Sequence, residues 1–223
     1  MNVQPYFPEP IEVPGNIANA SYRTLNKFIK TVGLLYYSTL VFAWFAGQHF
    51  AQTWSLRFAA TFLVGSIIFL SLSRTWLKGV TEVFVSTVVL IPTLVGVGTF
   101  MALLEQRGFP SWVLAICVSA ATLYNVLSGL DFSFSGQFFL SLLTVWVYIL
   151  TVYFFGKVSS KQAIVGSLFA VSFLFYFVYD FACLLKRRIE GEQVAAVSDL
   201  YRDVFNIFSY TVRVIYHWRK FKI

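Results

Sequence analysis

The sequence is short of charged residues. Only 12% of its 223 residues are Asp, Glu, Lys or Arg, whereas 58% are hydrophobic, and the mean hydropathy is +0.71. A soluble domain carries charge on about a quarter of its residues. This shortage of charge excludes an ordinary water-soluble domain and indicates a polytopic membrane protein.

Cysteine and histidine are also scarce, with two of each in the chain. Cys117 and Cys183 lie in apolar segments and form no CxxC pair, so we expect neither a disulfide framework nor a zinc centre. His49 and His217 fall near predicted helix boundaries, which disfavours a serine protease with a buried Ser–His pair. P-loop and dinucleotide fingerprints are absent. We therefore expect a protein that is not an enzyme and has no cofactor.

Stretches without Asp, Glu, Lys or Arg recur at lengths suited to the membrane, where a core of about 30 Å takes roughly 20 helical residues. The second stretch, 58–73, is short, but the Arg57 side chain can extend this span by reaching the lipid headgroups. A seventh segment, 193–217, is apolar but contains charges. We predict an all-α integral membrane protein, with an irregular tail at 1–22 and a seven-helix transmembrane domain at 23–223. The six uncharged stretches are 31–56, 58–73, 83–104, 108–130, 132–156 and 162–179.

The net charge is +7, and the Lys and Arg residues lie in short groups between the spans. This distribution favours contact with the lipid bilayer and disfavours nucleic-acid binding. An N-terminus on the inner side places eight loop cations inside and three outside, which agrees with the positive-inside rule. The side of the C-terminus stays open. The inner cations are Arg23, Lys27, Lys30, Arg74, Lys78, Lys186, Arg187 and Arg188, and the outer ones are Arg107, Lys157 and Lys161.

The seventh segment places most of its polar residues on one helical stripe, since they are spaced alternately by four and three positions. An amphipathic helix lying flat on the membrane is one interpretation. The stripe is narrow and of mixed sign, which favours a buried polar seam facing other helices. The stripe consists of Asp199, Asp203, Asn206, Tyr210, Arg213 and His217.

Asp180 directly follows the sixth uncharged stretch, roughly 8 Å inside the inner end of that span. An ionised side chain at mid-bilayer costs from about 3 to more than 10 kcal/mol, so a buried acid needs partners. One interpretation is an interfacial acid neutralised by the cations 186–188. The other is a carboxylate that faces Asp203 across two helices.

Two facing carboxylates cannot both ionise cheaply in a medium of low dielectric constant, so such a pair holds one proton and titrates as a unit. Asp180 and Asp203 would then form a proton switch. Their oxygens also suit a hard cation such as Ca²⁺, which makes both candidate metal-binding positions. Arg74 and Arg213 are candidate counter-ions.

The last part of the sequence resembles the transmembrane Bax-inhibitor-motif family. Tyr179-Asp180 is followed by a short basic loop and by LYRDVFNIF (200–208), which is similar to the LYLD-x-x-NLF segment of that family. The resemblance implies a seven-helix fold with the C-terminal helix in the centre. It also implies a pH-sensitive Ca²⁺ leak, with Asp180 and Asp203 as the sensor, Arg74 as a latch and Arg213 late in the seventh helix.

Two features depart from the family pattern. Span 58–73 lacks the acid of the bacterial members, and Trp218-Arg219-Lys220-Phe221-Lys222 replaces the acidic C-terminus of some eukaryotic ones. We expect a bacterial plasma membrane, with an ER or Golgi-type membrane as the alternative.

The sequence leaves two rivals to the leak function. An intramembrane aspartyl protease would carry its second acid in GxGD, whereas Leu200-Tyr201-Arg202 stands before Asp203. The stronger rival is a non-conducting protein that binds a membrane protein partner and modulates a protease, a channel or a death pathway. Ca²⁺ flux that depends on pH would distinguish the leak from this rival.

Overall fold

The computed structural model describes residues 13–76, 80–128 and 132–203, and their side chains except those of 73–76, 80, 82 and 203. Over these residues the chain forms α-helices and no strand, which confirms the all-α prediction. A short 3-10 turn, η1, precedes them. The elements are η1 (Ile17–Asn19), α1 (Tyr22–Phe50), α2 (Leu56–Trp76), α3 (Val80–Glu105), α4 (Trp112–Leu127), α5 (Phe134–Phe154), α6 (Ser160–Arg187) and α7 (Gln193–Asp203).

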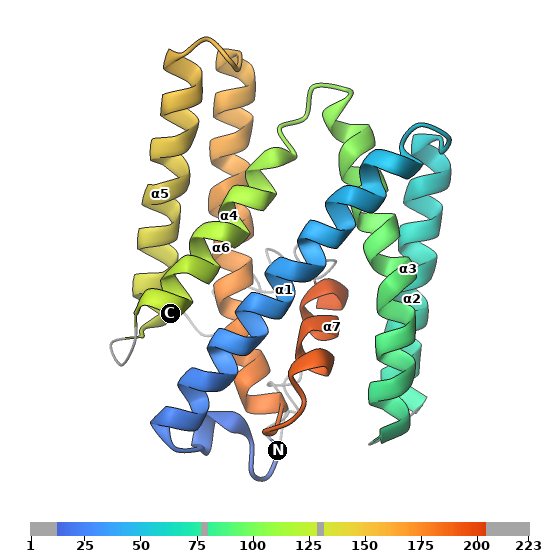
Figure 1. Cartoon of the computed structure of the whole chain (residues 1–223), viewed down its shortest axis with the longest axis vertical. Helices are drawn as coiled ribbons and strands as arrows, with labels where there is room; N and C mark the ends of the chain where they lie inside the picture. Colours follow the sequence, from blue (N-terminus) through green and yellow to red (C-terminus); the bar gives the residue numbers. More distant parts are fainter. Residues whose placement is uncertain (1–12, 77–79, 129–131, 204–223) are drawn as a thin grey trace, which may run out of the picture.

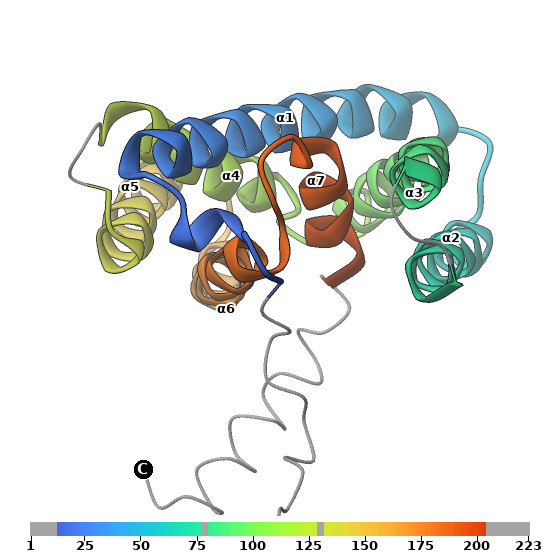
Figure 2. The same cartoon turned by 90° about the horizontal axis from the view of Figure 1, so that it is seen from below.

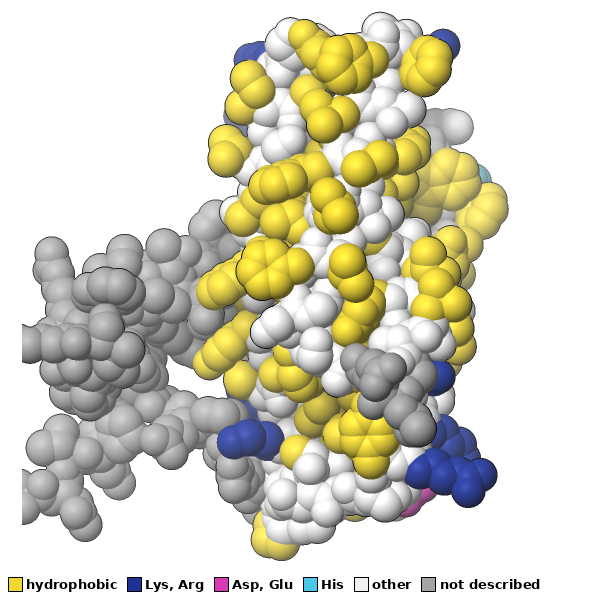
Figure 3. Space-filling model, turned by 90° about the vertical axis from the view of Figure 1, so that its left-hand side faces the viewer, with side chains coloured by type: hydrophobic (Ala, Val, Ile, Leu, Met, Phe, Trp, Pro, Cys, Tyr) yellow, Lys and Arg dark blue, Asp and Glu magenta, His cyan; other side chains and the backbone are white. Residues whose placement is uncertain are grey.

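Within the described part of the chain, four helices are long and apolar enough to cross a membrane: α1, α5, α6 and the part of α3 from Val83 to Glu105. Shorter apolar helices lie at Leu56–Leu72 and Trp112–Leu127. Figure 3 shows hydrophobic side chains over the middle of one face and Lys or Arg toward its two ends. A side surface this apolar suits hydrocarbon, so the structure agrees with an integral membrane protein.

The described part of α7 lies at the centre of the bundle. It packs against α1, α2, α3 and α6, while α2–α3 and α5–α6 form neighbouring pairs on either side (Figures 1 and 2). Every residue from 195 to 201 is buried. A helix that is buried on all sides is enclosed by protein. This part of the seventh segment therefore does not lie flat on the membrane surface, and the predicted central position is confirmed for residues 193–203.

A glycine contact brings α1 and α3 close together. A Cβ atom on Gly98 would overlap the backbone carbonyl of Ala43, and one on Gly47 would overlap the carbonyl of Gly98. Only glycine leaves room for two helical backbones at this distance, which is the way small residues let membrane helices approach. The crossing fixes α1 across the face of α3, where α7 also packs.

Helix boundaries differ from those of the uncharged stretches. The first stretch was predicted at 31–56, whereas α1 begins at Tyr22, after the N-cap Ser21, and ends at Phe50. Arg23 and Lys27 are exposed on its first turns. Charge-free runs mark the part of a helix inside the hydrocarbon, and a helix can continue beyond it into the headgroup layer. The division between tail and domain at 22/23 stays a prediction, because residues 1–12 lie outside the described part.

Candidate functional site

A buried ion cluster joins α6 to α7. The Nε of Arg188 donates to Oδ2 of Asp199 at 2.8 Å, and Nη1 of Arg202 lies 2.9 Å from the other oxygen, Oδ1. The Arg188 and Asp199 side chains are 6% and 3% exposed. Each carboxylate oxygen thus has its own arginine, and such charge-assisted bonds are the strong kind.

Local sequence explains how the two helices bring these charges together. Arg188 follows the last residue of α6 and is extended, with φ of −117°. Gly191 adopts a φ of +98°, which glycine tolerates best, and reverses the chain before α7 begins at Gln193. Asp199 and Arg202 are three positions apart on α7, so they are neighbours on its surface.

The N-terminal segment closes the end of α6 beneath this cluster. The backbone N–H of Ile17 donates to the carbonyl of Arg188 at 2.8 Å, and that of Val13 donates to the carbonyl of Lys186 at 3.1 Å. Carbonyls in the last turn of a helix lack partners within the helix. The segment around η1 therefore caps α6 and holds the backbone of Arg188 in place.

Asp180 lies about two turns before the end of α6 and is 5% exposed. It is close enough to Tyr36 of α1 to interact with it electrostatically. The Tyr36 ring lies 4.9 Å from the ring of Tyr201 of α7, whose hydroxyl is 3.0 Å from that of Thr39. Helices α1, α6 and α7 therefore meet around a polar region at the end of the bundle that carries the Asp199 cluster.

The predicted site is seen only in part. Asp180 and Asp199 are both buried and lie at the same end of the bundle. Asp203 is the last residue of α7 and Arg74 belongs to α2, but their side chains lie outside the description. Asn206, Tyr210 and Arg213 lie outside the described residues. The Asp180–Asp203 pair, its use as a Ca²⁺ site and the Arg74 latch therefore stay predictions.

Sequence reasoning missed Arg188. It was counted among the cations of the inner loop, yet it is a buried counter-ion of Asp199. Arg202 was left off the polar stripe, although its spacing of three from Asp199 was the visible signal. No pattern in the sequence marks Arg188, because its pairing depends on the turn through Gly191.

The arrangement suits a structural ion cluster that holds two helices together better than it suits a metal site. Over the described residues, no three His, Cys, Asp or Glu side chains gather as metal ligands. Asp199 already accepts bonds from two arginines, so its negative charge is balanced. Breaking a buried pair by removing one partner leaves an uncompensated charge and costs several kcal/mol. The cluster therefore fixes α7 to the end of α6.

Comparison with known proteins agrees with this architecture. The chain is 33% identical over 106 residues to Protein LIFEGUARD 3 of Arabidopsis thaliana, a match that covers 46% of this chain and 42% of that protein. It is 36% identical over 100 residues to Protein LIFEGUARD 2 of the same plant, a match that covers 42% of this chain and 41% of that protein. It is also 33% identical over 99 residues to BI1-like protein of that plant, which covers 44% of this chain and 39% of the relative. The chain is related to the Bax-inhibitor-motif family.

This relationship confirms the resemblance drawn from the C-terminal sequence. The chain spans about two fifths of the length of the curated Bax-inhibitor relatives it matches. No family model and no solved structure matches it. The relatives and the apolar helices together support an integral membrane protein that is similar to these Bax-inhibitor proteins.

Proposed function

We propose that the protein is a cation leak, with Ca²⁺ as the permeant ion, which is controlled by protonation of buried carboxylates. The observation that carries this proposal is the burial of Asp180 and Asp199 at one end of the bundle, at 5% and 2% exposure. Buried acids inside a membrane bundle are expensive and typical of ion and proton pathways. Because two arginines already balance Asp199, we assign proton sensing to Asp180 together with Asp203.

The surroundings of Asp180 support a switch at this position. Tyr36 of α1 and Cys183 of α6 are among the titratable groups close to it, and the cations Lys186 and Arg187 follow on its own helix. Helix α2, which carries Arg74, packs against α7, which ends at Asp203. In the proposed mechanism, Arg74 binds ionised Asp180 in the closed state, and a proton shared by the two acids weakens that contact.

A pocket at the opposite end of the bundle supports a cation path. It measures about 130 Å³ and lies between α1, α3 and α4, with Gln48 and Glu105 among its lining residues. Ser111 donates to the Glu105 carboxylate at 2.8 Å. Oxygen ligands of this kind suit hard cations. Between this pocket and Asp180 the core is filled by buried apolar side chains such as Leu90 and Leu94, so ions would pass only after these helices separate.

Flux of Ca²⁺ into liposomes tests the proposal. Purified protein should pass Ca²⁺ at a rate that changes between pH 6 and 8, and Asp180→Asn or Asp203→Asn should abolish that change. Arg74→Ala should raise resting flux. Glu190→Gln is the matched control, since Glu190 is an exposed acid in the α6–α7 loop. Zero flux refutes the leak, and flux with an intact pH response in both Asn variants refutes the carboxylate switch.

A second candidate is a non-conducting membrane protein that modulates cell death through a membrane protein partner. The names of the relatives, LIFEGUARD and BI1-like protein, favour it. Under this alternative the buried acids serve packing, and the Asn variants would lose stability without any effect on flux. A bacterial plasma membrane, with an ER or Golgi-type membrane as the alternative, stays a prediction that imaging of a fluorescent fusion would check.

A further inference from the structure

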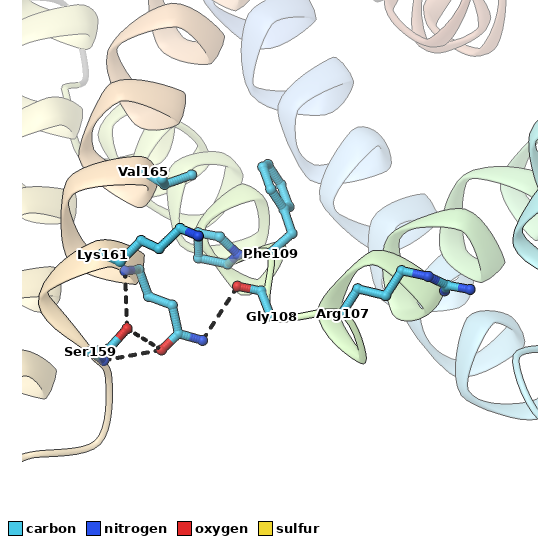
Figure 4. A pocket seen from close by; sticks show the side chains of 8 residues that line it. Arg107, Gly108, Phe109, Ser159, Lys161 and Val165 are labelled. Carbon is cyan, nitrogen blue, oxygen red and sulfur yellow. Dashed lines mark hydrogen bonds between the residues drawn. The ribbon is translucent and has the colours of Figure 1, made fainter.

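A second pocket lies where the α3–α4 loop meets the start of α6. It measures about 520 Å³ and is distinct from the ion cluster, which lies at the other end of α6. Figure 4 shows Lys161 and Val165 contributed by α6, and Arg107, Gly108 and Phe109 by the loop after α3. Lys161 extends from α6 toward that loop.

The pocket is positively charged. Arg107 and Lys161 line it, and the two segments that form it, 106–111 and 155–165, contain no Asp or Glu. These two residues are also among the three cations predicted for the outer loops, where the positive-inside rule keeps cations few. Lys161 faces the concavity, whereas the Arg107 side chain is directed away from Lys161 (Figure 4), so Lys161 is the cation that an anionic occupant would meet.

Short-range contacts hold the walls of the pocket in place. Ser159 and Gln162 form a capping box at the start of α6, and Nε2 of Gln162 also reaches the carbonyl of Gly108 at 3.5 Å. The start of α4 and the loop before it both pack on α6, since a Cβ on Gly166 would lie 3.0 Å from a methyl group of Val113 and 3.6 Å from Cγ of Pro110. Lys161 therefore faces a preformed site.

The position of the pocket identifies the kind of anion. It lies at the ends of two membrane-spanning helices, α3 and α6, where a bilayer places its headgroups. Ile164 and Leu168, one and two turns further along α6, are 62% and 66% exposed. A phospholipid has this same arrangement, with a phosphate at the surface and acyl chains running into the hydrocarbon.

We infer that this pocket binds the phosphate of a phospholipid headgroup and prefers anionic lipids. Lys161 carries the larger share of the binding. Arg107 contributes less, because Nη1 of its guanidinium already donates to the carbonyl of Leu103 at 2.8 Å. The acyl chains lie along the exposed face of α6 beside Ile164 and Leu168.

Lipid retention tests the inference. The purified full chain is exposed to micelles containing equal amounts of phosphatidylglycerol and phosphatidylcholine, and bound lipid is counted by native mass spectrometry. Phosphatidylglycerol should be retained preferentially, and Lys161→Gln should reduce its retention about fivefold, the effect typical of one cation at a membrane surface. Lys161→Arg should retain it, because the charge is kept.

Lys157→Gln is the matched control, because Lys157 lies in the same loop region but does not line the pocket. An equal loss in Lys157→Gln would show binding to general positive charge and would overturn the inference. So would an equal preference for the two lipids. Displacement of the lipid by millimolar inorganic phosphate would assign the pocket to a free anion and would also overturn it. These results are independent of Ca²⁺ flux.

Discussion

At the scale of residues, Asp199 is an acid buried among cations. Its side chain is 3% exposed and contacts two arginines. The desolvation of these ions is costly, and only the geometry of both contacts offsets that cost. Arg188 also approaches Glu192 at 3.7 Å, but the Glu192 side chain is 28% exposed and solvent screens the contact. One arginine thus has a buried and a partly exposed partner.

This contrast gives the first prediction. Asp199→Asn should lower the stability of the protein by about 3 kcal/mol, because it leaves buried arginines without their counter-ion. Glu192→Gln should change stability by less than about 1 kcal/mol. Thermal unfolding of both variants in the same detergent, followed by intrinsic tryptophan fluorescence, checks the difference. Equal losses would mean that burial does not set the strength of these ion pairs.

At the scale of elements, the contact between α1 and α3 depends on two glycines. Gly98 faces a backbone carbonyl of α1, which cannot move aside as a flexible side chain can. Gly65 of α2 has no atom within 4 Å of the position where a Cβ would lie. Two glycines in neighbouring helices of the same bundle therefore have opposite tolerance for one added methyl group.

The second prediction follows from that difference. Gly98→Ala should destabilise the protein by about 3 kcal/mol or more, since overpacking against rigid atoms forces the helices apart. Gly65→Ala should be neutral or stabilising by up to about 1 kcal/mol, because alanine favours helix. Unfolding temperatures of the two variants decide the matter. A Gly98→Ala protein as stable as the parent would show that α1 and α3 are further apart than described.

The sequence predicts these helices well where they lie inside the hydrocarbon of the membrane. The lack of charge located each apolar helix, because an ion inside hydrocarbon is penalised wherever it falls. Charge says nothing about where a helix stops outside the hydrocarbon, so the uncharged stretch 31–56 does not mark the ends of α1 at Tyr22 and Phe50. Asp199 is buried, but the polar seam through it stays a prediction, because the side chains of its other members lie outside the described part. The pairing of Asp199 with Arg188 was not predicted, because the partner comes from a loop whose path depends on tertiary packing.

At the scale of the whole molecule, the two ends of the bundle differ in charge. One end holds the start of α1, the end of α6 and the start of α7, and the other holds the α3–α4 and α5–α6 loops (Figure 1). The first end carries most of the loop cations of the sequence. Inner loops are enriched in Lys and Arg, so this end should face the cytoplasm and the phospholipid pocket should face the opposite side.

Labelling of introduced cysteines tests this orientation, and the native cysteines should add little background labelling. Both native cysteines are buried, Cys117 at 0% and Cys183 at 8% exposure, so a membrane-impermeant maleimide should scarcely react with the parent protein in intact cells. Lys157→Cys lies in the α5–α6 loop and should be labelled at once. Glu190→Cys lies in the α6–α7 loop and should be labelled only after the membrane is permeabilised. The reverse pattern would place the Asp180 end outside, where external rather than cytoplasmic acid would have to drive any proton switch.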